Sequence, residues 1–160
     1  MMETLAVLLL ILLVGLLYNI IPPYIKRKKT EICFAPSMVK TGLPIIPVKS
    51  GDKELYMLVD SGSDWSHIDK AVLDEVKATK LDGGNHISTL GGVVTAPFYD
   101  VELTVKGEKM NETCLVLDFG DAFKSTEEEL GHEVHGILGM SFLEKHDYVL
   151  DFNKLIAYQK

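Results

Sequence analysis

An uncharged apolar run from Leu5 to Ile21 dominates the start of this 160-residue chain. A run of this kind predicts a membrane-spanning helix. At a rise of about 1.5 Å per residue it reaches roughly 25 Å, slightly short of a hydrocarbon core of roughly 30 Å. We therefore extend the predicted transmembrane helix to residues 4–24, where Pro22 and Pro23 bring it to an end.

The alternative to an anchor is a signal peptide that is removed from the mature protein. A signal peptide needs a basic start and a small-x-small cleavage site, whereas this chain opens with Met1-Met2-Glu3 and leaves the run through Pro22-Pro23-Tyr24. We therefore favour a retained single-pass anchor that contacts membrane lipid. The basic residues 26–29 follow the run, and the positive-inside rule then places the C-terminal domain in the cytoplasm. A cleaved segment and a domain outside the cytoplasm stay open as the alternative.

Composition excludes two classes of protein. The chain has 16 Lys and Arg against 23 Asp and Glu, a net charge of −7, so it lacks the basic surface that a nucleic-acid partner requires. Its two cysteines, Cys33 and Cys114, are too few for a disulfide scaffold. We divide the remainder into a basic juxtamembrane linker, residues 25–42, and one domain, residues 43–160.

The domain is predicted to be mainly β with short helices. Apolar residues precede and follow the turn at residues 50–53, which indicates a hairpin that ends at Asp60. Val101, Leu103 and Val105 alternate with polar residues, and the run 113–117 is able to pair back against them. Gly91-Gly92 suits a tight hairpin loop. Residues 71–77 and 141–146 are predicted short helices, and 148–152 and 155–158 are predicted closing strands.

The residues with the clearest chemistry are Asp60-Ser61-Gly62-Ser63, which follow the apolar strand ending in Leu58-Val59. A carboxylate at the end of a buried strand needs hydrogen-bond donors, and Gly62 lets backbone N–H groups approach it closely. A strand-ending Asx turn is the structural alternative, and the short motif alone does not decide between the two.

Together with His135-Gly136-Ile137-Leu138-Gly139, this motif resembles the retropepsin-like aspartic proteases. The resemblance spans roughly residues 43–158 and implies a retropepsin-like β-barrel half. It implies that Asp60 is the catalytic carboxylate, that Ser61 bonds to the partner loop and that Gly62 donates to the carboxylates. Gly91 and Gly92 match the flap, and Ile137, Leu138 and Gly139 match the segment behind the active-site loop. At Ser63, where viral members often have Ala, we expect a hydroxyl that donates to the carboxylate.

One chain supplies only half of such a site, because Asp60-Ser61-Gly62 is the single Asp-Ser/Thr-Gly motif. Aspartic-protease chemistry needs two carboxylates that share one proton. We therefore expect a homodimeric endopeptidase that needs no cofactor and hydrolyses polypeptide substrates with a water activated by two Asp60 residues. The alternative is a catalytically inactive peptide-binding or scaffold module of the same fold at the membrane.

A metal site is the competing interpretation of His132-Glu133-Val134-His135. The zinc-protease pattern needs two residues between Glu and the second His, so that both His lie on one helical face, and here there is one. We therefore expect no metal.

Overall fold

The computed structural model describes residues 31–89 and 92–160, which belong to one compact unit, Glu31–Lys160. The predicted transmembrane helix at residues 4–24 and the basic cluster at 26–29 lie outside the described residues. Within the described part of the chain, no helix is long and apolar enough to span a membrane.

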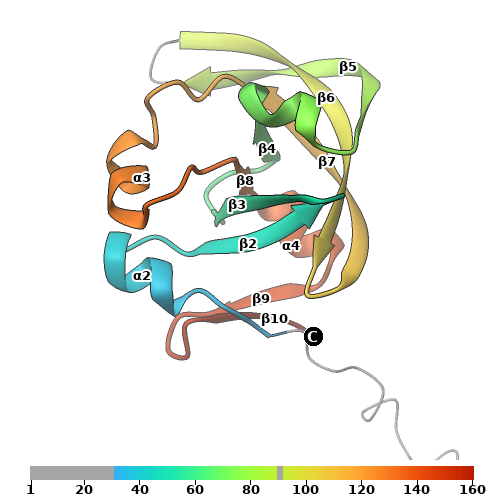
Figure 1. Cartoon of the computed structure of the whole chain (residues 1–160). Coiled ribbons are helices and arrows are strands. Elements are labelled where there is room, and N and C mark those ends of the chain that lie inside the picture. Colours follow the sequence, from blue (N-terminus) through green and yellow to red (C-terminus); the bar gives the residue numbers. More distant parts are fainter. Residues whose placement is uncertain (1–30, 90–91) are drawn as a thin grey trace, which may run out of the picture. The chain divides into compact units, whose positions relative to one another are not determined.

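A closed β-barrel forms the body of this unit (Figure 1). Hydrogen-bonded neighbours follow the order β2-β3-β8-β4-β7-β6, and β6 pairs back to β2 through Lys49 and Thr104. The strands are β2 (Ile45–Ser50), β3 (Lys53–Val59), β4 (Ser66–Asp69), β6 (Gly92–Val105), β7 (Glu108–Leu117) and β8 (Gly136–Leu138). The expected mainly β fold is therefore confirmed.

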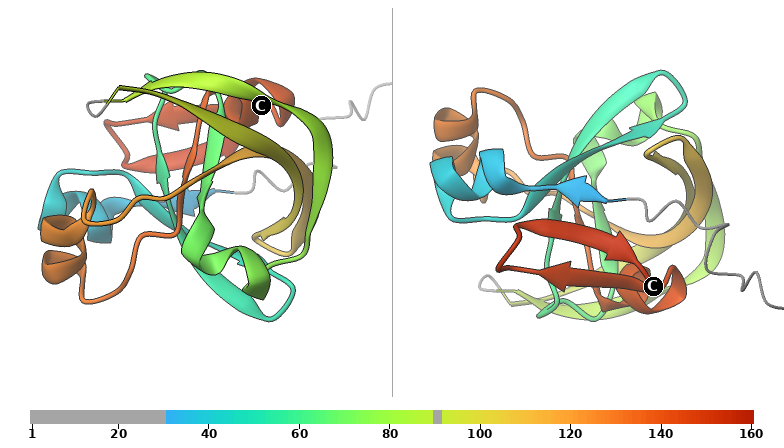
Figure 2. Two further views of the ribbon diagram at one scale, coloured as in Figure 1. Left: turned by 90° about the horizontal axis from the view of Figure 1, so that it is seen from above. Right: turned by 90° about the horizontal axis from the view of Figure 1, so that it is seen from below.

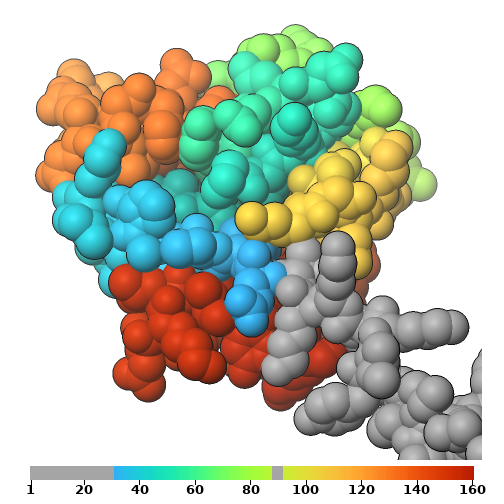
Figure 3. Space-filling model, turned by 60° about the horizontal axis from the view of Figure 1, so that its bottom comes forward, coloured from blue at the N-terminus to red at the C-terminus, as the bar shows by residue number. Residues whose placement is uncertain are grey.

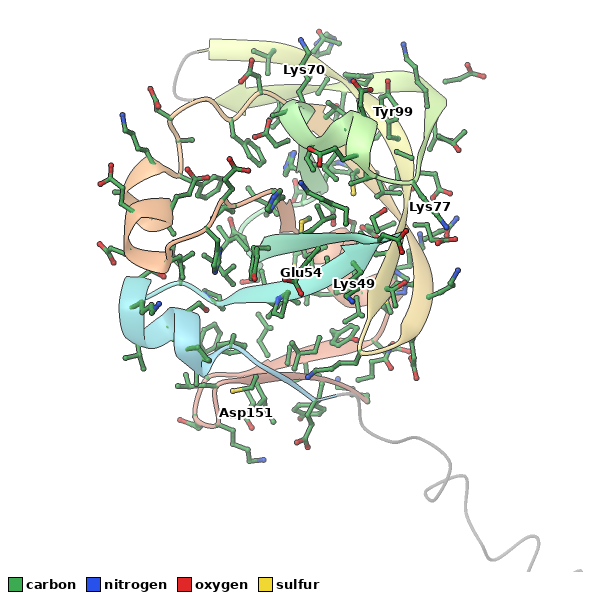
Figure 4. All side chains as sticks on the ribbon, in the orientation of Figure 1. Lys49, Glu54, Lys70, Lys77, Tyr99 and Asp151 are labelled. Atoms are coloured by element: carbon green, nitrogen blue, oxygen red, sulfur yellow. The ribbon has the colours of Figure 1, made fainter. Side chains whose placement is uncertain are left out.

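Alternation of side chains explains how this barrel acquires its core. Val101, Leu103 and Val105 of β6 are fully buried, as their period of two predicts. Outward positions carry charged residues such as Lys49 and Glu54, which are cross-strand partners in the β2–β3 hairpin (Figure 4). The inward side chains form one apolar cluster that continues to Phe142 of the last helix.

The hairpin of β5 (Ala78–Thr89) and β6 is longer than the sequence predicts. Its two strands pair from Ala78 and Val101 to Thr89 and Gly92, with an irregularity between Lys80 and Gly84. β5 pairs only with β6 in the sheet order, and the hairpin extends past the barrel (Figures 1 and 2). The hairpin that we expect to be the flap therefore has longer strands than the sequence predicts.

A separate three-stranded sheet joins the two ends of the described chain. Its order is β1-β10-β9, with β1 at Ile32–Cys33, β9 at Tyr148–Asp151 and β10 at Ile156–Gln159. In Figure 3 the N-terminal segment, in blue, lies against these C-terminal strands, in red. The helices are short: α2 (Ala35–Thr41), the 3-10 helix η2 (Lys70–Glu75), α3 (Lys124–Leu130) and α4 (Met140–Lys145).

The predicted boundary at residue 43 differs from the structure. Ile32 pairs with Ala157, and Phe34 is fully buried in the same apolar cluster as the barrel. The part of the expected linker that follows residue 30 is thus an integral piece of the domain. The sequence pattern missed this because its apolar partners are the last residues of the chain, more than 100 positions away.

Candidate active site

Asp60 lies where β3 leaves the barrel wall. β8 lies between β3 and β4, and it pairs in parallel with β3 so that Leu138 is opposite Val59. The backbone N–H of Asp60 donates to the carbonyl oxygen of Leu138 at 2.9 Å. The predicted segment Ile137-Leu138-Gly139 therefore lies directly beside the strand that carries Asp60.

The turn after Asp60 holds one of its two carboxylate oxygens. Gly62 N–H donates to Asp60 Oδ1 at 2.8 Å, and Ser63 N–H donates to the Asp60 carbonyl at 3.2 Å. No donor from the described residues reaches Oδ2. Ser61 and Gly62 are exposed, and Asp60 is half-buried. The carboxylate is thus fixed on one side and open to an incoming group on the other.

Ser63 does not donate to Asp60, contrary to the expectation. Its hydroxyl donates to the carbonyl oxygen of Trp65 at 2.8 Å, and Nε2 of His67 lies 3.0 Å from the same Oγ. A serine hydroxyl has one proton, so none is left for Asp60. Ser63 instead connects the turn to His67, a residue that the sequence interpretation missed.

His67 is a buried histidine, only 7% exposed, next to the site. Burial lowers the pKa of His67 below its ordinary value, against a smaller opposing effect of the Asp60 charge. Its Nδ1 is buried and has no hydrogen-bond partner in the described structure.

A second residue that sequence analysis missed is Glu112 of β7, which is 1% exposed. Its Oε1 accepts hydrogen bonds from Ser66 and Ser141, each at 2.8 Å. Its Oε2 faces His146 Nε2 at 3.4 Å and Lys145 Nζ at 3.8 Å. Glu112 lies on the same face of β7 as the buried Cys114 and Val116, two and four positions further along. This period of two was the sequence signal that could have shown that Glu112 is buried.

This buried carboxylate connects the active-site segment with the strand behind it. Ser66 Oγ, which donates to Glu112, also accepts the N–H of Gly139 at 3.2 Å. Ser141 lies in the first turn of α4 and donates to the same carboxylate. The side chain of Glu112 therefore connects β4, β7, the end of β8 and α4. Burial alone would raise the pKa of Glu112, but the nearby His146, the hydrogen bonds from Ser141 and Ser66, and the charge of Lys145 outweigh it and lower the pKa.

Gly139 is required where β8 ends because the backbone of the Asp60 segment passes directly over it. A Cβ at this position would collide with the carbonyl oxygens of Trp65 and Ser63. Met140 N–H also donates to the Ser63 carbonyl at 2.8 Å. The two sequence motifs are therefore packed against each other through backbone atoms.

The β5–β6 arm contains the hairpin that the resemblance assigns to the flap. Gly92 begins β6 with a φ of 118°, a conformation that favours glycine, whereas Gly91 lies outside the described residues. At the base of the arm, the ring of Phe98 lies 5.1 Å from the ring of Trp65, which belongs to the Asp60 segment.

The two histidines of the possible metal motif have other partners. His135 Nδ1 accepts the N–H of Tyr56 at 3.1 Å, and the His132 ring stacks on the Tyr56 ring at 3.6 Å. Among residues 31–89 and 92–160, no group of three or more His, Cys, Asp or Glu side chains is arranged to hold a metal ion.

The chemistry available at this site is that of a carboxylate. Asp60 is able to accept a proton or to share one with a second carboxylate, and the open Oδ2 is the side from which such a group would approach. Asp60 belongs to the only Asp-Ser/Thr-Gly motif in the sequence.

The chain matches a known protein family. A family model described as "Aspartyl protease" matches residues 46–142, a range that includes both the Asp60 turn and Gly139. Among solved structures, the chain is similar to EIAV protease complexed with the inhibitor HBY-793, with 26% identity over 64% of this chain and 86% of that chain and a TM-score of 0.49. No curated protein matches the chain.

Proposed function

Because this chain belongs to the aspartyl protease family, we propose that it is an endopeptidase that hydrolyses peptide bonds with a water activated by Asp60. The observation that carries this proposal is the Asp60 turn itself. Gly62 N–H holds Oδ1 at 2.8 Å, while Oδ2 stays open at an exposed loop. A purely structural Asx turn would not need the second motif, Ile137-Leu138-Gly139, packed directly behind it.

The second carboxylate is proposed to come from Asp60 of another copy of the chain. Two neighbouring carboxylates cannot both ionise, so they share one proton: one acts as a base on water and the other polarises the substrate carbonyl. Supporting this, Ser61 is exposed and its hydroxyl makes no hydrogen bond within the described residues. In a two-fold dimer the same turn meets itself, and each Ser61 is free to bond across to the partner loop.

The arm formed by β5 and β6 is proposed to close over the bound substrate. An extended peptide offers backbone groups that a strand or hairpin binds by hydrogen bonds, and closure also excludes water. Gly92 gives the end of the arm its conformational freedom and has no chemical role.

The deciding experiment is peptide cleavage by the purified protein across pH, with and without pepstatin, beside the Asp60→Asn variant. We expect pepstatin-sensitive cleavage that falls by at least about a thousandfold in Asp60→Asn, since a proton-transfer group is lost. The variant should unfold at the same temperature as the wild type, because Asn keeps an oxygen for Gly62. An equal cleavage rate in Asp60→Asn would refute the mechanism.

We also propose that residues 4–24 anchor the protein in a membrane with its C-terminal domain in the cytoplasm. This rests on the apolar run and on the basic residues that follow it. An anchor would raise the effective concentration of subunits and favour pairing. Resistance of the protein to alkaline extraction from membranes, together with protease access to a C-terminal tag from the cytoplasmic side, is the expected result.

A further inference from the structure

A cavity of about 310 Å³ opens beside Asp60, between the active-site turn and the β5–β6 arm. Gly62, the residue that holds Asp60 Oδ1, is part of its wall. The polar and aromatic residues of the wall are Ser63, Asp64, Trp65, His67, Asn85 and His86. We name this cavity the His67 pocket. Its position predicts that a side chain of a substrate bound across Asp60 enters it.

The protons in this pocket can be placed from the hydrogen bonds. Ser63 Oγ gives its single proton to the Trp65 carbonyl, so it accepts from His67 Nε2, which lies 3.0 Å away. His67 in its neutral form therefore carries its proton on Nε2 and leaves a lone pair on Nδ1. This Nδ1 is buried without a partner, in a side chain that is more than nine-tenths buried. Nδ1 is closed to solvent, so His67 contributes the rest of its ring to the wall of the pocket.

The charge of the wall has one sign. With histidines counted as neutral, Asp64 is the single charged residue of the wall among the described residues, and no Lys or Arg contributes to it. Asp64 is exposed, and so is its neighbour Trp65, at 38%. A carboxylate and an aromatic ring together suit a cation that donates hydrogen bonds.

We propose that the His67 pocket is a specificity subsite that selects a basic side chain, lysine or arginine, from the substrate. The inference rests on the proposed protease function, because it concerns the peptide that Asp60 would cleave. In this arrangement the charged head of the substrate side chain pairs with Asp64. The stem of the side chain packs on Trp65, as lysine and arginine stems do on apolar surfaces.

The test uses the full-length protein and a mixed octapeptide library, followed by matched peptides that differ at one position. That position carries lysine, norleucine or glutamate, and it is moved in turn along the peptide. We expect one position at which the lysine peptide has kcat/KM at least about tenfold above the norleucine peptide. Preference for norleucine or glutamate at every position would overturn the proposal.

Two variants connect the preference to the pocket. Asp64→Asn keeps the shape of an exposed side chain and removes its charge, so the ratio of kcat/KM for lysine over norleucine should fall about fivefold or more. Trp65→Leu keeps an apolar side chain but removes the aromatic ring that favours a cation, so it should lower the same ratio, and its melting temperature shows whether the turn is intact. Asp74→Asn, an exposed change in η2, is the control and should leave the ratio unchanged. An undiminished ratio in both pocket variants would refute the assignment.

A measurement of peptide binding tests the pocket independently of the proposed catalysis. Asp60→Asn retains the pocket, so it should bind a fluorescent lysine peptide more tightly than the norleucine peptide even though it does not cleave. If Asp60→Asn still cleaves, the catalytic proposal fails while the binding preference is measured independently. If cleavage depends on Asp60 but neither binding nor cleavage prefers lysine, the subsite proposal alone fails.

Discussion

At the scale of single residues, Glu112 is a buried anion whose partners belong to the active-site framework. Ser66 and Ser141 hold Oε1, while His146 and Lys145 face Oε2. Through these partners Glu112 connects the segment after Asp60 to α4, but it does not contact Asp60 itself. Glu112 is thus a positioning residue, and its effect on activity would act through stability and geometry.

The Glu112→Gln variant should be less stable at neutral pH by about 1–3 kcal/mol, because hydrogen bonds to a charged group are replaced by weaker ones. The folded state lowers the pKa of Glu112, so the charge stabilises the protein above the ordinary carboxyl pKa near 4.5, and this contribution is lost as the pH falls through the lower folded value. Chemical denaturation between pH 3 and 7 should show a flatter pH dependence for the variant. Glu102→Gln is the control: Glu102 pairs with Lys77 and Lys109 at the surface, so its loss should change stability less.

Two glycines in the site have different physical roles, which alanine substitutions should separate. A Cβ at the exposed Gly62 would lie 3.1 Å from Asp60 Oδ1 and would push the carboxylate, whereas a Cβ at Gly139 would collide with backbone. Gly62→Ala should therefore lower kcat by about tenfold or more with little change in melting temperature. Gly139→Ala should cost about 1–3 kcal/mol of stability, measured by denaturant unfolding. Equal loss of stability in both variants would contradict this assignment.

At the scale of elements, the β5–β6 arm has little to do with the stability of the barrel. From Gly84 to Thr89, β5 pairs only with β6, and Val93 of the opposite strand is 69% exposed. Few buried contacts are lost if this part of the hairpin changes shape. The arm is therefore free to serve binding.

The Gly92→Val variant tests whether the arm serves binding while contributing little to the stability of the barrel. Valine is strained at a φ of 118°, so the end of the arm should be distorted. We expect kcat/KM to fall by about tenfold or more while the free energy of unfolding changes by less than about 1 kcal/mol. Gly107→Val places the same substitution at a φ of 86° in the turn at the other end of β6. That control should keep its turnover, and a parallel loss of turnover there would argue against a flap.

Local pattern predicted the elements that carry their own apolar signal. The β2–β3 hairpin, the alternating strand β6 and helix α4 were found because period and turn residues agree in each. Strand β4 was missed because Ser66-His67-Ile68-Asp69 has one apolar residue, and it is a strand only by pairing with β7 and β8. The position of Asp60 was predictable from its motif, but the roles of His67 and Glu112 arise from contacts across the barrel that no local window contains.

At the scale of the whole molecule, the proposed mechanism requires two chains. The described unit presents Asp60 on an exposed turn, and the sequence has no second Asp-Ser/Thr-Gly motif. Activity should therefore depend on how many chains with an intact Asp60 meet each other. This dependence can be measured without any knowledge of the natural substrate.

Mixing wild-type protein with Asp60→Asn gives a quantitative prediction. If subunits exchange freely, an equal mixture contains wild-type, mixed and variant dimers in a ratio of about 1:2:1. Because each site needs two Asp60 carboxylates, cleavage per total protein should be about one quarter of the wild-type value, whereas a site complete in one chain would give about one half. Equal mixing with Asp74→Asn should leave the rate unchanged. A rate near one half after verified exchange would show that a single Asp60 suffices and would exclude the shared site.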